Sequence, residues 1–123
     1  MARARRTESE RAAIISDLRS KSPTFRVLFV TPESLGVTAF RAALQAAHAE
    51  GHVQMLAVDE AHCISTWGHD FRPAYLALGP FRRHLPGLPV MALTATATRE
   101  VYSSICTHLR LQDPVAVLGS FNR

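Results

Sequence analysis

The chain has 123 residues, and 47% of them are apolar, which suits one globular domain with a single hydrophobic core. No apolar run reaches the roughly 18 residues that a membrane-spanning helix needs, and the basic, polar first residues lack the apolar segment of a secretory signal. We therefore expect an intracellular protein with no membrane partner. The 14 basic and 10 acidic side chains suit a polyanionic partner but do not require one.

The first thirty residues predict a basic arm, a helix and a strand. Residues 1–6 form a short basic stretch, which we expect to be a disordered arm. Thr7 and Glu10 have the spacing of a capping box, which predicts a helix that Pro23 ends. Residues 25–30, FRVLFV, are rich in β-branched and aromatic side chains and predict a buried strand.

The middle of the chain alternates between helix and strand. Residues 38–50 carry apolar side chains at helical spacing and precede Gly51, which predicts a helix with a glycine cap. Residues 53–58 predict a second buried strand. Residues 72–84 predict a helix that starts at Pro73 and breaks at Gly79-Pro80.

The last third predicts a strand at 89–93, a helix at 99–109 and a short final strand at 114–118. Short, continuously apolar strands that alternate with helices are typical of an α/β fold, in which helices cover both faces of a parallel sheet. Ligands bind such sheets beyond the carboxyl ends of the strands. The residues that follow the first three predicted strands are therefore the candidates for a site.

Two adjacent carboxylates, Asp59 and Glu60, follow the second predicted strand directly. This is a Walker B arrangement: in nucleotide hydrolases the aspartate holds Mg²⁺ against the ATP phosphates, and the neighbouring carboxylate orients and deprotonates the attacking water. We therefore expect ATP and Mg²⁺ as cofactors, with Asp59 holding the metal through water and Glu60 acting as the base. The alternative for such a pair is a helix N-cap or a solvated turn.

Residues 57–73 read AVDEAHCISTWGHDFRP. This stretch closely resembles helicase motif II and the aromatic-rich loop of the RecQ family of DNA helicases. The resemblance implies that His62 belongs to the ATP site together with Asp59 and Glu60. It also implies that the loop couples the binding of single-stranded DNA to ATP hydrolysis.

Flat rings and a cation in this loop suit stacking on unpaired bases and contact with phosphates. The candidate DNA-binding residues are Trp67, His69, Phe71 and Arg72. In the alternative, Trp67 and Phe71 lie four residues apart on one helix face and belong to the core, although Gly68 and Pro73 disfavour a regular helix.

A zinc site is a further alternative for this region, since His62, Cys63 and His69 are possible ligands. No fourth ligand stands at a suitable spacing, so we expect no zinc. Cys63 and Cys106 also lack the density of a disulfide scaffold, and we expect both to be free thiols.

Two shorter motifs fit the same resemblance. The third predicted strand leads into Thr-Ala-Thr-Ala-Thr at 94–98, which resembles helicase motif III and implies that Thr94, Ala95 and Thr96 couple the ATP site to DNA. The alternative is a strand end followed by a helix cap at Thr98. Thr31-Pro32, in the sequence VTPE, resembles motif Ib, which contacts the DNA backbone, although by itself it is a turn.

The resemblance covers the chain from about residue 7 onward, in the family's motif order. It implies that residues 7–118 are the C-terminal part of the first RecA-like motor domain, a three-layer fold of the P-loop NTPase type whose N-terminal strands are missing. Residues 119–123 would begin the linker to a second motor domain, with Asn122 where the family usually has Asp.

The motif that grips ATP phosphates has no counterpart in this sequence. A P-loop needs G-K-[ST], yet the only lysine, Lys21, has no glycine before it. Phosphoryl transfer depends on that lysine and on an arginine finger, which the family supplies from its second motor domain. We therefore expect a helicase fragment with negligible ATPase activity from this polypeptide alone.

For the whole helicase, the resemblance implies ATP-dependent 3′ to 5′ translocation on single-stranded DNA and unwinding of duplex junctions in DNA repair and recombination. It implies the nucleus of a eukaryote or the cytoplasm of a bacterium. The alternative is a truncated relative that hydrolyses nothing and binds single-stranded DNA or a protein partner.

Overall fold

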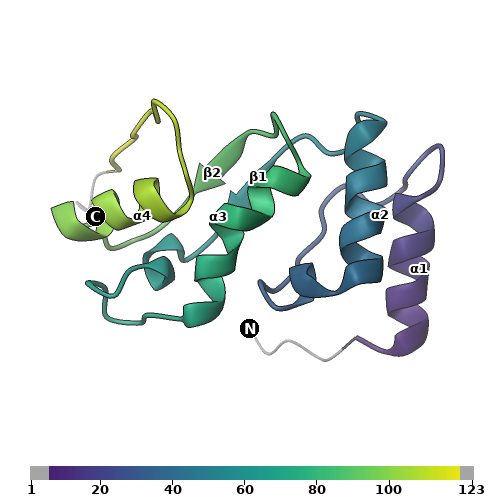
Figure 1. Cartoon of the computed structure of the whole chain (residues 1–123), viewed down its shortest axis with the longest axis horizontal. Coiled ribbons are helices and arrows are strands. Elements are labelled where there is room, and N and C mark those ends of the chain that lie inside the picture. Colours follow the sequence, from purple (N-terminus) through teal and green to yellow (C-terminus); the bar gives the residue numbers. More distant parts are fainter. Residues whose placement is uncertain (1–5, 120–123) are drawn as a thin grey trace. The chain divides into compact units, whose positions relative to one another are not determined.

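The computed structural model describes residues 6–119, which form two compact units (Figure 1). The first unit holds the described residues up to Leu56 together with Phe81–Met91. The second unit holds Ala57–Pro80 and the described residues from Ala92 onward. The predicted arm at 1–6 and linker at 119–123 lie almost entirely outside the described residues.

Helix α1 (Glu8–Leu18) begins with the predicted capping box. The Thr7 hydroxyl accepts the Glu10 N–H, and the Glu10 carboxylate accepts the Thr7 N–H at 2.9 Å. The helix ends before Pro23, earlier than predicted, because the Asp17 carboxylate binds the chain that turns back. It accepts hydrogen bonds from the Thr24 N–H at 2.9 Å and the Thr24 hydroxyl at 2.8 Å.

Helix α2 (Thr38–Ala49) follows a short 3₁₀ turn, η1 (Ser34–Gly36), and packs against α1. Its buried face consists of Phe40, Ala43 and Ala47, at the predicted helical spacing. The glycine cap is confirmed: Gly51 has a φ of 78° and the next residue donates its N–H to the Ala47 carbonyl at 2.9 Å.

Strands β1 (Leu56–Val58) and β2 (Val90–Ala92) pair in a two-stranded parallel sheet. The Leu56 N–H donates to the Pro89 carbonyl and the Leu93 N–H to the Val58 carbonyl, both at 2.9 Å. The strands lie where the sequence predicts them but are shorter. Their backbone pairing confirms the α/β fold class and sets Asp59 directly after the last residue of β1.

Two predicted strands are wrong. Residues 25–30 and 114–118 form no strand. Most of their apolar side chains are exposed, to 70% for Phe29 and 89% for Val115 and Val117. Composition indicates a buried strand, but burial and ladder hydrogen bonds require neighbours that the described residues do not provide.

Residues 73–84 form three short turns in succession: η3 (Pro73–Ala77), α3 (Leu78–Phe81) and η4 (Arg82–His84). The predicted start at Pro73 is confirmed. The predicted break at Gly79-Pro80 is instead a change from 3₁₀ to α geometry at Leu78. A proline in the first turn of a helix is tolerated because its missing N–H has no intrahelical acceptor there.

Helix α4 (Arg99–His108) starts at Thr98, whose hydroxyl accepts the Val101 N–H at 3.3 Å. Its buried line, Val101, Ile105 and Leu109, has a spacing of four residues, and the helix packs against η2 (Ala61–Ile64). Among residues 6–119, no helix has the length and apolar character needed to cross a bilayer.

Candidate functional site

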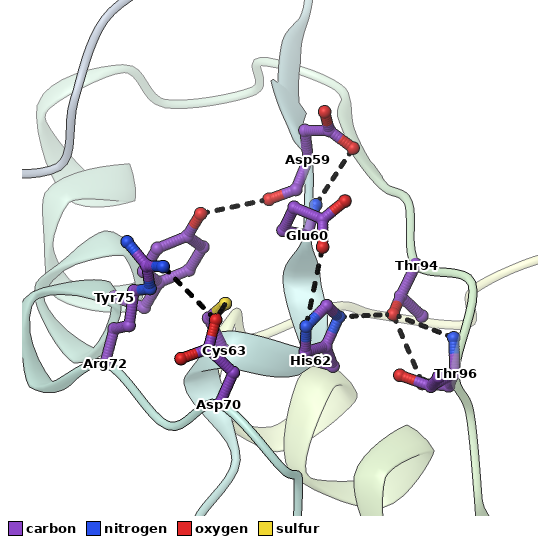
Figure 2. A network of polar contacts seen from close by, with 9 residues as sticks. All are labelled: Asp59, Glu60, His62, Cys63, Asp70, Arg72, Tyr75, Thr94 and Thr96. Carbon is purple, nitrogen blue, oxygen red and sulfur yellow. Dashed lines mark hydrogen bonds and ion pairs between the residues drawn. The ribbon is translucent and has the colours of Figure 1, made fainter. Parts of the chain in front are cut away.

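The site begins where β1 ends. Val58 is buried, whereas Asp59 and Glu60 are exposed beyond it (Figure 2). One carboxylate oxygen of Asp59 accepts the Glu60 N–H at 2.9 Å, and the Tyr75 hydroxyl donates to the Asp59 main-chain carbonyl at 3.2 Å. The strand and these two contacts hold the backbone of Asp59 while its carboxylate stays open to solvent.

Glu60 has a left-handed backbone, with φ 51° and ψ 43°. This conformation costs a residue with a side chain about 1 kcal/mol or more. It is held in place because the next residue, Ala61, is fully buried and donates its N–H to the Leu93 carbonyl at 2.8 Å. The sharp turn brings the Glu60 carboxylate back to 3.5 Å from Nε2 of His62.

His62 is 4% exposed and joins the two predicted motifs. Nε2 faces the Glu60 carboxylate at 3.5 Å. Nδ1 and the Thr94 hydroxyl share a hydrogen bond of 2.7 Å, and the same hydroxyl donates to the Thr96 carbonyl at 3.2 Å and accepts the Thr96 N–H at 3.3 Å. Glu60, His62, Thr94 and Thr96 thus form one chain of polar contacts (Figure 2). The neighbouring Ala95 is exposed.

The loop after His62 closes on itself. The Arg72 N–H donates to the Cys63 carbonyl at 2.8 Å, and the Arg72 guanidinium pairs with Asp70 at 3.2 Å. Burial, and then the negative charge of Asp70, raise the pKa of the Cys63 thiol. The hydrogen bond to Asp70 raises the pKa of Arg72, which is therefore charged at any physiological pH.

Trp67 is 73% exposed and does not belong to the core, so the core interpretation of Trp67 and Phe71 is wrong for Trp67. Its backbone is nevertheless anchored. The Trp67 N–H donates to the Ser65 hydroxyl oxygen at 3.1 Å, and that hydroxyl donates to Ser104 of α4 at 2.9 Å. The structure presents the indole on a fixed backbone, whereas Phe71 is half-buried.

His69 lies against the buried ring of the site. Its ring stacks on His62 with centroids 4.8 Å apart and planes 16° apart. The group of possible metal ligands in the structure contains Asp70 instead of His69. The possible ligand atoms of Asp70, His62 and Cys63 lie within 4.8 Å of one another. The ligand trio weighed from the sequence is therefore not the one that the fold assembles. Both ring nitrogens of His62 already have partners, so a metal ion would have to displace one of them.

Thr31 and Pro32 lie in the first unit and are half-buried. Ser34 donates its hydroxyl to the Thr31 carbonyl at 2.7 Å, and the Thr31 side chain accepts the Ser34 N–H at 3.2 Å. Locally this is a self-capped turn that begins η1. A role of Thr31 and Pro32 in contacting DNA stays a prediction.

The sequence profile of DEAD/DEAH box helicases matches residues 2–104. The chain belongs to the DEAD/DEAH box helicase family. Its parallel α/β architecture is thus a partial RecA-like fold.

Within this family the chain is of the RecQ type. It is 44% identical over 107 residues to ATP-dependent DNA helicase Q5 of Rattus norvegicus, covering 87% of the chain and 11% of that protein. It is 46% identical over 104 residues to ATP-dependent DNA helicase RecQ of Pasteurella multocida, covering 83% of the chain and 16% of that protein. The chain therefore spans only a small part of the curated relatives that it matches.

Sequence reasoning missed three residues of this candidate site. They are Tyr75, which bonds the Asp59 backbone, and Ser65 and Ser104, which tie the loop to α4. The motifs give no indication of these contacts. Their sequence signal is weak, because the hydrogen-bond partner of a single hydroxyl is known only when the packing of α4 against the loop is known.

Proposed function

We propose that this chain supplies the hydrolysis and coupling part of the first motor domain of a RecQ-type, ATP-dependent DNA helicase. The contact of His62 with both Glu60 and Thr94 carries the proposal. One buried ring contacts the carboxylate suited to activate water and the hydroxyl of the motif that the resemblance assigns to coupling. The names of the two similar proteins, both ATP-dependent DNA helicases, support the same function.

The carboxylates fit the proposed chemistry. Exposed carboxylate oxygens at a strand end suit Mg²⁺, a hard cation that keeps several of its water molecules. Bound there, Mg²⁺ would offset negative charge on the ATP phosphates. Asp59 would hold the ion through water. Glu60 would orient the attacking water and take its proton, while the nearby His62 ring keeps the Glu60 carboxylate in place.

The loop would carry the DNA signal. An unpaired base stacking on Trp67 would stabilise one position of a loop whose His69 ring lies on His62. Movement of that stack would change how His62 holds Glu60. Translocation from 3′ to 5′, unwinding of duplex junctions and roles for Phe71, Arg72, Thr31 and Pro32 in DNA contact belong to the proposal through the family resemblance.

A chimaera tests the proposal. The matching 104 residues of the Pasteurella multocida RecQ are replaced by those of this chain, and DNA-stimulated ATPase activity is measured. We expect activity in the chimaera and its loss in Glu60→Gln with ATP binding retained. A folded chimaera that binds ATP and DNA but hydrolyses nothing contradicts the catalytic role.

The second candidate function is a non-catalytic module that binds single-stranded DNA or a protein. The observation that favours it is the exposure of Trp67 on an anchored backbone, which needs no nucleotide. Under this alternative the chain binds an unpaired strand, and the chimaera remains without ATPase activity.

A further inference from the structure

A shallow groove on the second unit adjoins Trp67. Trp67 forms one wall, and the outer face of α4 forms the other. The α4 residues that line it are Arg99, Glu100, Ser103, Ser104, Thr107 and His108. The motifs single out none of these six residues.

The groove follows from the periodicity of α4. Arg99, Ser103 and Thr107 lie four residues apart, so they form one line along the helix beside the buried line of Val101 and Ile105. The line is exposed and carries a guanidinium followed by two hydroxyls. At a rise of 1.5 Å per residue it extends about 12 Å, the length of roughly two nucleotides of an extended strand.

We propose that this groove holds an unpaired DNA strand, with one base stacked on Trp67 and the adjoining phosphates on the Arg99–Ser103–Thr107 line. This inference rests on the proposed function and extends DNA binding from the loop to α4. Aromatic stacking beside a cationic, hydroxyl-rich track is the combination with which proteins bind single strands without reading sequence.

Two further observations favour a nucleic acid. The Ser65–Ser104 hydrogen bond of 2.9 Å ties the loop to α4, so the two walls keep their spacing before any ligand binds. Arg99 occupies the first turn of α4, where the N-terminal end of the helix dipole adds to its positive charge. Glu100 is the only acid among the lining residues, and its formal charge is equal and opposite to that of Arg99.

Trp67 is the only tryptophan, so its fluorescence reports directly on the groove. The 123-residue chain is titrated with a short oligodeoxythymidylate, which has little structure of its own. We expect quenching of the Trp67 emission. Trp67→Ala, followed by the anisotropy of a labelled oligonucleotide, should weaken binding by about tenfold, as expected when one stacking platform is lost.

Arg99→Gln isolates the contribution of α4. Arg99 is exposed, so the substitution removes a charge without removing packing. We expect weaker binding and a salt dependence of log K reduced by about 0.7, the value for one phosphate contact on a single strand. Arg99→Lys should restore the slope. The matched control, Arg11→Gln on the exposed face of α1, should change the slope much less.

The outcomes separate the two proposals. Quenching together with a slope change specific to Arg99 supports the groove. Quenching with Arg99→Gln and Arg11→Gln behaving alike overturns the α4 inference and leaves DNA binding by the loop intact. No quenching and no binding by the unsubstituted chain overturns both.

Discussion

Among the six glycines, Gly79 in α3 is the one where an added methyl group meets the closest obstacle. A Cβ at Gly79 would lie 2.1 Å from the main-chain oxygen of His108, at the end of α4. Ordinary contact begins at 3.4 Å, and the obstacle is backbone rather than the end of a flexible side chain. Gly79→Ala therefore forces α3 and the last turn of α4 apart.

The size of the effect follows from two opposing contributions. Separation by roughly 1.3 Å (3.4 minus 2.1) forfeits a large part of the packing of neighbouring buried groups, and overpacking of this kind costs about 1–3 kcal/mol. Leu109, next to His108, is 1% exposed and is among the groups affected. Alanine is favoured over glycine inside a helix by at most about 1 kcal/mol. Because the obstacle is backbone, we take the upper end of the packing cost, about 3 kcal/mol, which leaves a net loss of about 2 kcal/mol.

Urea denaturation, followed by circular dichroism and Trp67 fluorescence, measures this loss. With an m-value of about 2 kcal/mol per molar, Gly79→Ala should lower the midpoint by about 1 M. The matched control is Gly36→Ala, where an added Cβ meets nothing within 4 Å. Gly36→Ala should leave the midpoint unchanged or slightly raised. Equal midpoints for the two variants would refute the reasoning.

Three other substitutions or modifications test particular contacts. Hydrogen bonds, first that from the Thr24 backbone, lower the pKa of Asp17 from 3.8. The stabilisation of the fold by ionised Asp17 is therefore complete above pH 3.8 and is lost as the pH falls through the lower folded pKa. Asp17→Asn should remove this loss of stability at acid pH from denaturation curves. Iodoacetamide should modify half-buried Cys106 before Cys63, because Cys63 is 2% exposed and its thiol has a raised pKa. Mass spectrometry of timed samples measures the order. If Cys63 is modified first, the burial of Cys63 is contradicted. Glu60→Gly should raise the free energy of unfolding by about 1 kcal/mol relative to Glu60→Gln, because glycine adopts the left-handed conformation without steric cost, and equal denaturation midpoints would show that no strain is stored there.

Local signals predicted the parts of the fold that depend on neighbours in sequence. The capping box at Thr7 and the glycine cap at Gly51 are confirmed because each involves residues a few positions apart. The strands expected at 25–30 and 114–118 fail for the opposite reason. A strand is completed by a partner distant in sequence, and apolar composition alone does not identify that partner.

In the candidate site, too, the sequence predicted the motif residues but not the contacts between residues distant in sequence. The motif residues Glu60, His62 and Thr94 were predicted, and the fold brings them into contact across 32 residues of sequence between His62 and Thr94. The Ser65–Ser104 bond was not predicted, because serines are common and their spacing has no periodic signal. Motifs thus indicated the candidate groups, and the tertiary structure showed which residues contact them.

Two of the residues that depart from ordinary folding preferences lie on either side of the same short segment. Glu60 takes a left-handed backbone before η2, and Trp67 exposes a large indole after it. Every residue of η2, Ala61–Ile64, is buried, and its His62 also carries the His69 stack. A close-packed segment moves as a unit or not at all, since its neighbours leave no room for gradual deformation. A base that shifts the loop at Trp67 would therefore act on Glu60 through η2, which gives the proposed coupling a short physical route.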